Sequence, residues 1–481
     1  MKTIAIIGGG FSGTITAVNL ARLSQTPLRV CLINHAFPTG RGVAYSTRRP
    51  EHLLNVVARN MSALADHPSH FVEWLATRTE FADTSEATLR EMFAPRRTYG
   101  DYLRGLLHWY SRPVDGRSCV QIDMLSAEVI DITPAGPHSV VTLAEGAPIE
   151  ADKVVLATGN QPPCELKSNG KPFVHPAYQS TPWQDWESKL PDRDQPVILL
   201  GTGLTTVDAY LTLAACDWRG PIYAISRNGL LPLSHFKGIE YPDFPPADMS
   251  NLDLAGLAAL VEEHCKRLRA RGENPAIVVD KLRPHTQRLW QGLSVEDRRE
   301  FGRRFRARWN VTRHRIAASI HDQVSQAMAN GKLRIVKGNI RELADADGKV
   351  RVTIEEAPGQ TRSIDGALVV NCTGPQESFT AGDSRLYAKL FERGLVVADD
   401  LDMGIRADAD FAVIDSEGRV SDFLFALGPL LKGSLWETTA VPELRSQAFR
   451  LAQTLIEACG HEEPRNTWQP PAEADVLEYC I

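Results

Sequence analysis

The chain has 481 residues, which is enough for two large folding units or three smaller ones. Hydrophobic residues make up 43% of it and charged residues 23%, a composition typical of globular proteins. The formal net charge of −6 argues against nucleic acid or an anionic membrane surface as a partner held by overall charge. Apolar runs are too short for a membrane-spanning helix or a secretory signal, so we expect a cytoplasmic protein.

The 8 cysteines are scattered along the chain. No two of them have a Cys-x-x-Cys or similarly short spacing. A structural zinc site and a dithiol redox centre are therefore not expected, and we predict that the protein binds no metal.

The strongest motif lies at the N-terminus. The apolar run over residues 2–7 predicts a buried parallel strand, and the pattern of residues 12–23 predicts a helix. Between them stands G-x-G-x-x-G, in which Gly8 makes a tight turn, Gly10 lets a pyrophosphate approach the backbone and Gly13 lets the helix pack on the strand. The helix N-terminus adds free N–H groups. The predicted dinucleotide contacts are Gly8, Gly10, Phe11, Ser12 and Gly13.

The next predicted strand, residues 29–33, departs from this pattern. It is followed by Asn34, where an acidic residue usually binds the ribose hydroxyls. An amide can still make that hydrogen bond without a charge, so Asn34 is a candidate cofactor contact.

Two similar strand-to-turn segments frame the middle of the chain. Residues 152–156 lead into Ala157-Thr158-Gly159, and residues 367–370 lead into Asn371-Cys372-Thr373-Gly374. We interpret them as the points where the chain leaves a first domain and returns to it. The predicted organisation is therefore a first part over 1–165, an inserted domain over 166–365 and a second part over 366–481. Thr158, Gly159 and Gly374 are candidate cofactor contacts.

A second nucleotide-binding turn lies inside the insertion. The strand predicted over 196–200 enters Gly201-Thr202-Gly203-Leu204-Thr205-Thr206, where Thr206 replaces the third glycine. A strand over 222–225 follows and ends near Arg227, a position from which arginine accommodates the 2′-phosphate of NADP. A surface arginine at a strand end is the alternative. The predicted contacts are Gly201, Gly203, Leu204, Thr205 and Arg227. Together the two turns predict an α/β fold with two Rossmann-like dinucleotide-binding domains.

The segment 281–315 carries eleven Lys and Arg residues against three Asp and Glu residues. Nucleic-acid binding is one interpretation. Apolar residues at spacings of four and seven, with Ser294 and Asp297 as a capping pair, favour an amphipathic helix with a charged outer face.

The order of motifs resembles a known family. It comprises Gly8–Gly13, Gly40-Arg41-Gly42-Val43-Ala44-Tyr45-Ser46, His52–Val56, Ala157-Thr158-Gly159, Gly201–Asp208, Ser226-Arg227 and Leu427–Thr438. This pattern is similar to that of the two-dinucleotide-domain flavoproteins called FAD/NAD(P)-binding proteins, which are related to the class B and N-hydroxylating flavin monooxygenases. The resemblance implies FAD in the first domain and NADPH in the inserted one. Similar members act on urate or on the amines of amino acids.

The resemblance also implies which residues surround the flavin. Arg41, Tyr45, His52 and Asn55 would approach the ring from the loop after the second strand. His52 and Asn55 are the candidate catalytic residues; a structural histidine and a turn asparagine are the alternatives. The opposite side of the ring would be closed by Gly428, Trp436, Glu437 and Thr438, where Trp436 has packing as its alternative.

The resemblance implies an FAD-dependent, NADPH-consuming monooxygenase. It would oxygenate a small, polar, nitrogen-containing substrate through a flavin hydroperoxide, with oxygen as co-substrate. The alternatives are an NAD(P)H-dependent flavin reductase or oxidase that passes electrons to a quinone or partner protein, and a nucleotide sensor without activity. Neither nucleic acid nor a membrane is expected as a partner, and homo-oligomerisation is left open.

Overall fold

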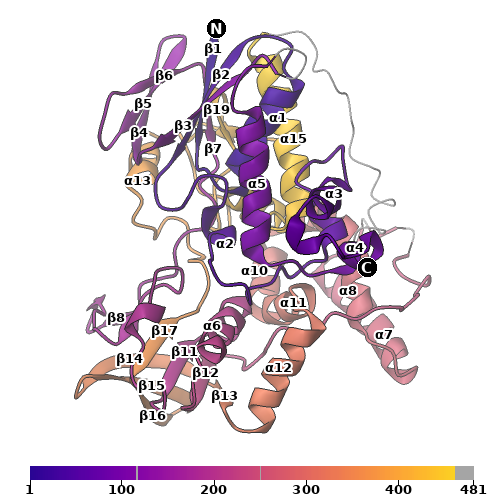
Figure 1. The fold of residues 1–481 in the computed structure, drawn as a ribbon, viewed down its shortest axis with the longest axis vertical. Coiled ribbons are helices and arrows are strands. Elements are labelled where there is room, and N and C mark those ends of the chain that lie inside the picture. The colour runs from indigo at the N-terminus through magenta and orange to yellow at the C-terminus, as the bar shows by residue number, and fades with distance from the viewer. Residues whose placement is uncertain (115–117, 247, 250, 461–481) are drawn as a thin grey trace.

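The computed structural model describes residues 1–114, 118–246, 248–249 and 251–460. Figure 1 shows two parallel sheets, one above the other, each with its own helices. This arrangement confirms the predicted α/β fold class with two Rossmann-like domains. Among the described residues, no helix combines the length and apolar character needed to cross a membrane.

The first sheet is built from segments at both ends of the chain. Its strand order is β18-β19-β7-β1-β2-β3, and all neighbours are parallel except β18 and β19. The strands are β1 (Lys2–Ile7), β2 (Leu28–Asn34), β3 (Gln121–Ser126), β7 (Lys153–Leu156), β18 (Ala412–Ile414) and β19 (Val420–Ala426). The central strands β1 and β7 are apolar and buried after their first one or two residues, as expected for strands covered on both faces.

Three helices form one layer over this sheet: α1 (Phe11–Leu23), α5 (Arg96–Tyr110) and α15 (Val441–Ala458). Helix α1 lies between the other two and is buried at almost every position, which explains its lack of a polar face. A small antiparallel sheet with helix α13 (Arg385–Glu392) belongs to the same domain; its strands are β4 (Val129–Ala135), β5 (His138–Leu143) and β6 (Ile149–Ala151). Short helices α2 (Gly42–Tyr45), α3 (His70–Ala76) and α4 (Glu86–Glu91) lie in the long connection before α5.

The second sheet is parallel throughout, in the order β10-β17-β11-β12-β13. The elements are β10 (Tyr178–Gln179), β11 (Val197–Leu200), β12 (Ile222–Ser226), β13 (Leu333–Lys337) and β17 (Leu368–Asn371), helices α6 (Leu204–Ala215) and α12 (Ala318–Ala329), and strands β14 (Asn339–Ala346), β15 (Lys349–Ala357) and β16 (Gln360–Gly366). Val197 and Leu199 of β11 face helices α6 and α12 on one side of this sheet. Ile198 and Leu200 face a three-stranded antiparallel sheet on the other side. A separate hairpin pairs β8 (Lys167–Ser168) with β9 (Lys171–Pro172).

The predicted return to the first domain at residue 366 is too early. Strand β17 follows that point and pairs in parallel with β11, so it lies in the middle of the second sheet. Its four residues are all buried, which an apolar strand between two covered faces requires. The chain therefore returns to the first domain after Asn371.

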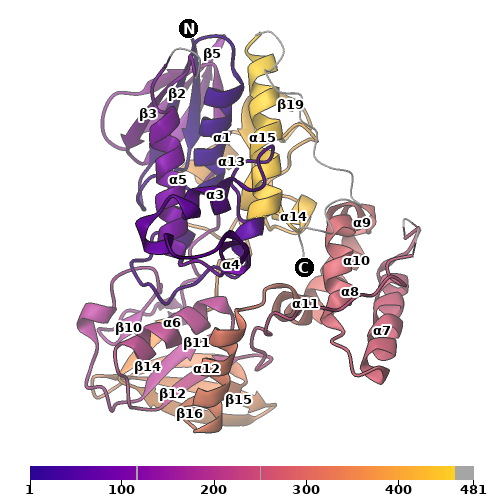
Figure 2. The same cartoon turned by 45° about the vertical axis from the view of Figure 1, so that its right-hand side comes forward.

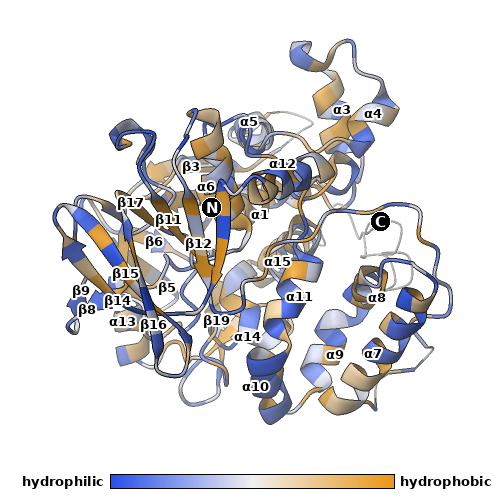
Figure 3. Ribbon diagram, turned by 90° about the horizontal axis from the view of Figure 1, so that it is seen from below, coloured by the Kyte–Doolittle hydropathy of each residue, from blue (hydrophilic) through white to orange (hydrophobic). Residues whose placement is uncertain are grey.

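The basic region forms several helices instead of one. The helical segment comprises α7 (Leu254–Ala270), α8 (Ala276–Leu282), α9 (Thr286–Gly292), α10 (Val295–Arg304) and α11 (Arg306–Arg313). Figure 2 shows it beside the second sheet and below α15. Ser294 caps α10 by accepting a hydrogen bond from the Asp297 N–H at 3.0 Å, which confirms the predicted capping pair. The hydrophilic face of α10 is plain in Figure 3.

Candidate functional site

The first glycine turn requires glycine at two positions. Gly8 has φ +114°, and a Cβ there would lie 2.2 Å from the Ala157 carbonyl oxygen. A Cβ on Gly13 would lie 1.9 Å from the Gly8 carbonyl oxygen. These contacts leave no room for any side chain, so the turn after β1 is fixed against both β7 and α1.

Gly10 differs because an added Cβ there would make only an ordinary van der Waals contact. Its nearest neighbour for an added Cβ is the Gly42 Cα at 3.7 Å. Helix α1 starts directly after Gly10 and has no side-chain cap, so its first N–H groups, those of Phe11 and Ser12 among them, face no side-chain acceptor. An open glycine at an uncapped helix N-terminus fits the pyrophosphate of a dinucleotide.

The second turn repeats this geometry. Gly201 has φ +125°, and its Cβ would lie 2.4 Å from the Cys372 carbonyl oxygen. An added Cβ on Gly203 meets nothing within 4 Å, and α6, which opens with Leu204 and Thr205, has no side-chain cap. Thr206 fits in place of the third glycine with only 1% of its surface exposed.

The two crossover turns also match each other. Gly159 follows β7 with φ +74°, and Gly374 follows β17 with φ +84°. Neither would meet another atom within 4 Å of an added Cβ. The Thr158 hydroxyl lies 2.7 Å from the Tyr387 hydroxyl, which ties the first of these turns to α13.

Asn34 supports the glycine turn, and its predicted ribose contact stays a prediction. Its Oδ1 accepts a hydrogen bond from the Gly9 N–H at 3.0 Å, and its Nδ2 donates to the Phe37 carbonyl. Since both ends of the amide are engaged, Asn34 stabilises the glycine turn from the neighbouring strand.

Arg227 stands at the end of the second βαβ unit. Its side chain is exposed and makes no hydrogen bond or ion pair with another described residue. The preceding Ser226 hydroxyl lies 2.8 Å from that of Thr202 and accepts the Gly229 N–H at 3.0 Å, which orders the loop. Arg227 is therefore held on an ordered backbone with its guanidinium available.

The loop after β2 covers the first turn. The Gly40 N–H donates to the Gly9 carbonyl at 2.8 Å, and Arg41 forms an ion pair with Asp101 of α5. The Tyr45 ring packs edge-on against Tyr99 at 4.7 Å, and burial raises the pKa of Tyr45 to about 12. Tyr45 is therefore a neutral packing group beside the turn.

His52 joins the two domains. Its Nδ1 lies 2.8 Å from the Thr47 hydroxyl, and its Nε2 lies 2.9 Å from the Thr212 hydroxyl and 3.1 Å from the Asp208 carbonyl oxygen, both on α6. Both ring nitrogens are thus engaged and the side chain is buried. This arrangement favours an interdomain structural role over the predicted proton donation.

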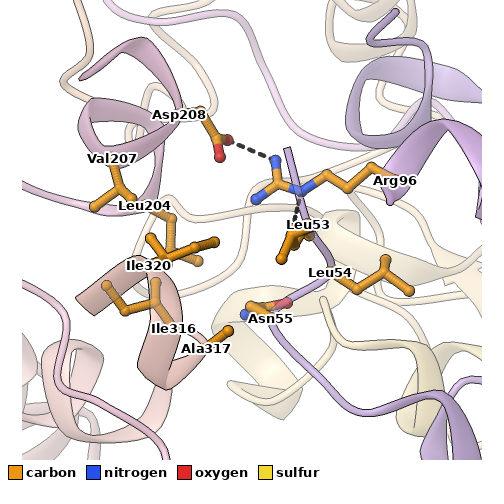
Figure 4. A pocket seen from close by; sticks show the side chains of 10 residues that line it. All are labelled: Leu53, Leu54, Asn55, Arg96, Leu204, Val207, Asp208, Ile316, Ala317 and Ile320. Carbon is orange, nitrogen blue, oxygen red and sulfur yellow. Dashed lines mark hydrogen bonds and ion pairs between the residues drawn. The ribbon is translucent and has the colours of Figure 1, made fainter. Parts of the chain in front are cut away.

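A small pocket lies at this domain interface (Figure 4). Asn55 and Leu53 line it from the first domain, and Leu204 lines it from the start of α6. On one side, Arg96 at the start of α5 donates to the Asp208 carboxylate of α6 at 2.6 Å. The pocket therefore connects the loop that covers the first turn with the helix that begins at the second.

Asn55 has a partner in the inserted domain. Its carbonyl oxygen lies 2.9 Å from His235 Nε2. Burial is the main cause that lowers the pKa of His235 to about 4, with Arg315 and Arg313 adding to the effect. His235 is therefore neutral near pH 7 and donates to Asn55.

The segment after β19 closes the site from the C-terminal side. A Cβ on Gly428, whose φ is +75°, would lie 2.9 Å from the Ser12 hydroxyl, so this turn touches the start of α1. The Thr438 hydroxyl donates to the Gly428 carbonyl at 2.9 Å and also contacts Gln447. Thr438 thus belongs to the same corner as the first glycine turn.

Trp436 and Glu437 face the helical segment. Trp436 follows the short helix α14 (Lys432–Leu435) and stacks on Trp290 at 4.8 Å. Glu437 accepts a hydrogen bond from Trp309 Nε1 at 3.2 Å and lies 3.6 Å from Arg313. Both residues therefore dock the helical segment on the first domain, and their contact with the cofactor stays a prediction.

Sequence reasoning missed the interface pair of Arg96 and Asp208 and the buried Arg313. Asp208 ends the Gly201–Asp208 motif. An acidic residue five positions past Gly203 does not by itself predict an ion pair with an arginine 112 residues away. The basic composition of 281–315 included Arg313 without distinguishing it from its exposed neighbours.

Comparison with known proteins supports the reading of the fold. Residues 5–161 match a protein family described as FAD-NAD(P)-binding. None of the curated proteins matches the sequence. Among solved structures, the chain is similar to the ornithine N-hydroxylase KtzI of Kutzneria sp. 744, at 15% identity and a TM-score of 0.63, over 94% of this chain and 98% of that one.

Two further structures are similar over nearly their full length. The L-lysine 6-monooxygenase of Pseudomonas syringae is 16% identical with a TM-score of 0.64, covering 95% of this chain and 100% of that one. The FAD-bound cadaverine monooxygenase DfoA of Erwinia amylovora is 12% identical with a TM-score of 0.62, covering 97% of each chain. The chain therefore has the fold of these structures, with the two dinucleotide-binding domains that its motifs indicated.

Proposed function

We propose that this protein is an FAD-dependent, NADPH-consuming monooxygenase that oxygenates the nitrogen of a small polar amine. The observation that carries the proposal is the pairing of two glycine turns of the same geometry across one interface. Gly10 and Gly203 each stand unobstructed at an uncapped helix, where an added Cβ would meet at most the Gly42 Cα at 3.7 Å. Leu204 and Asn55 line one pocket between the two domains.

FAD would be held by the first turn. Gly10 gives room for its pyrophosphate, and the N–H groups of Phe11 and Ser12 face the same space. Gly428 and Thr438 close the corner beside Ser12. When bound, the flavin supplies the redox chemistry by accepting hydride from NADPH and activating oxygen.

NADPH would be held by the second turn. Gly203 and the start of α6 fit its pyrophosphate, and the exposed Arg227 fits its 2′-phosphate. The Arg96–Asp208 ion pair and the His52 hydrogen bonds fix α6 against the first domain. These contacts would orient the nicotinamide toward the flavin.

One observation supports the substrate class and another supports the reaction class. Solved structures similar in fold are named as hydroxylases or monooxygenases of ornithine, lysine and cadaverine, all of which carry a free amine. Among the described cysteines, no two are joined or placed as a redox pair, so the structure offers no dithiol to take electrons from a flavin. We therefore favour an amine over a purine such as urate, with oxygen as co-substrate, in the cytoplasm.

The test is cofactor consumption by the purified protein. We expect a yellow protein whose NADPH oxidation is slow alone and faster with one amine from a panel of amino acids, diamines and purines. Peroxide release at an unchanged rate with every compound would contradict oxygenation and favour a reductase or oxidase. A protein that stays colourless after FAD addition would exclude both activities.

A further inference from the structure

A short segment after β2 crosses the first glycine turn at very close range. We call residues 40–46 the strap. Gly42 has φ +57°, and a Cβ on it would lie 2.9 Å from the Gly10 Cα. The Gly40 N–H donates to the Gly9 carbonyl at 2.8 Å. The strap therefore lies backbone against backbone on the turn that would hold the pyrophosphate.

Helix α5 supports the strap from the other side, and Figure 1 shows α2 beside it. A Cβ on Gly100 would lie 2.5 Å from the Tyr45 carbonyl oxygen and 3.2 Å from the Arg41 Cγ. On Gly105 of the same helix, the nearest atom to an added Cβ is Trp74 Nε1 at 3.8 Å. Glycine is a poor helix former, so the strap explains why residue 100 has no side chain.

One ion pair closes the strap at its N-terminal end. Arg41 Nη2 contacts the Asp101 carboxylate of α5, and Arg41 Nη1 lies 3.5 Å from the Tyr45 carbonyl oxygen. The Asp101 side chain is 53% exposed. An ion pair with so much water around it is weak and is screened by salt. Arg41 thus links the two ends of the strap to α5 through a contact that breaks easily.

The middle of the strap has little apolar contact to hold it. All four residues of α2 are partly or fully exposed, and Val43 is 37% exposed. The Tyr45 ring packs edge-on against Tyr99 at 4.7 Å and anchors the C-terminal end. Segments with few buried apolar contacts open at a low free-energy cost while the domain stays folded. The strap can therefore open about Tyr45 without unfolding the sheet below it.

We infer that the strap is the gate of the first dinucleotide site and that Asp101, by holding Arg41, keeps it closed. The inference rests on the proposed function, because it takes the ligand of the first turn to be FAD. A pyrophosphate at Gly10 would lie beside Gly42, so the cofactor enters and leaves past the strap. Asp101 is therefore a positioning residue that sets how long FAD stays bound without touching it.

The experiment follows the release of FAD from the flavin-loaded full chain, with free flavin separated and measured over time. Asp101→Asn is expected to release FAD about threefold faster at low salt. The ratio of the two release rates should fall toward one as salt is added, because salt screens the ion pair in the wild type. The control is Asp123→Asn, which breaks the partly exposed Arg29–Asp123 ion pair between β2 and β3 and should leave release unchanged.

Two glycines of α5 provide a matched pair of substitutions. Gly100→Ala is expected to displace the strap at Tyr45 and to speed FAD release about tenfold, whereas Gly105→Ala should leave release unchanged. Alanine is the better helix former, so the Tm of either flavin-free variant should stay within a few degrees of the wild type. Faster release would then come from the strap and not from a damaged helix. Hydrogen exchange at the amides of residues 40–46 should be slowed by FAD, and less so in Asp101→Asn.

The outcomes separate this inference from the proposed function. A yellow protein whose release rates are equal in the wild type, Asp101→Asn and Gly100→Ala would overturn the gate and leave the proposed function standing. Faster release in both variants, with no amine oxygenated, would support the gate and contradict the monooxygenase. If Gly100→Ala does not fold, the salt dependence of Asp101→Asn decides alone: a rate ratio that does not change with salt overturns the gate. A protein that binds no FAD would overturn both.

Discussion

The guanidinium of Arg96, in the first domain, lies 2.6 Å from the carboxylate of Asp208, in the inserted domain. Arg96 also donates to the Leu53 carbonyl at 3.0 Å. His52 holds the same turn of α6 through the Asp208 carbonyl and Thr212. One helical turn of the inserted domain is therefore held at two points by adjacent segments of the first.

Breaking this pair should affect both stability and hydride delivery. Asp208→Asn or Arg96→Met leaves one mostly buried charge without its partner, which costs about 3 kcal/mol. We expect a lower urea midpoint and a slower reduction of bound FAD by NADPH, both measurable on the purified protein. The double variant is expected to lose less stability than the two single losses added together. Additive losses would show that the pair does not couple the domains.

Substitutions at Gly10 and at Gly203 should affect different cofactors. An alanine at Gly10 or Gly203 meets no backbone closer than 3.7 Å, so the fold should tolerate either change. Gly10→Ala is expected to purify without flavin, since its Cβ enters the pyrophosphate space. Gly203→Ala is expected to stay yellow and to raise the KM for NADPH about tenfold. The flavin spectrum and steady-state kinetics check both. If Gly203→Ala were colourless and Gly10→Ala yellow, the two sites would be assigned the wrong way round.

Arg227 should determine the preference for NADPH over NADH. Its guanidinium is exposed on an ordered loop, where it fits a 2′-phosphate. Arg227→Ala is expected to raise the KM for NADPH about tenfold and to leave the KM for NADH unchanged. The exposed Arg334, which contacts Tyr223 on the same sheet, provides a control substitution. An unchanged ratio of the two KM values in Arg227→Ala would refute the assignment.

His235 should make the protein less stable in mild acid. The pKa of His235 is about 4 in the folded protein, against 6.5 for an ordinary histidine. Between these two pH values the unfolded chain therefore binds one proton on this ring that the folded protein does not. The free energy of unfolding therefore falls as the pH decreases from 6.5 toward 4, by on the order of 2 kcal/mol for this group. Urea titrations of the wild type and His235→Gln should converge at low pH, with exposed His35→Gln as control. A constant difference between the curves would contradict the shifted pKa.

Local patterns predicted the elements that bind nucleotides. The first strand is found at the predicted residues, and α1, β11 and β12 lie within a few residues of their predicted limits. These elements are encoded by short apolar runs and glycine turns, whose physical requirements are met by neighbours in the sequence. Strand β17 was placed in the wrong domain because an apolar run carries no information about which sheet it joins.

Side-chain roles that depend on distant partners could not be predicted. His52 was a catalytic candidate, but its ring bonds to α6, 156 residues further along the chain. Trp436 meets Trp290, and Glu437 meets Arg313, only after the helical segment folds back on α14. No local pattern specifies these contacts, since each partner alone is an ordinary surface or core residue.

The most direct test of the central claim follows the fate of oxygen. The protein loaded with FAD is given NADPH, isotopically labelled oxygen gas and the amine that best stimulates NADPH oxidation. We predict one labelled oxygen atom on the nitrogen of the product, with little peroxide released. Recovery of all the consumed oxygen as peroxide, and an unlabelled amine, would contradict it.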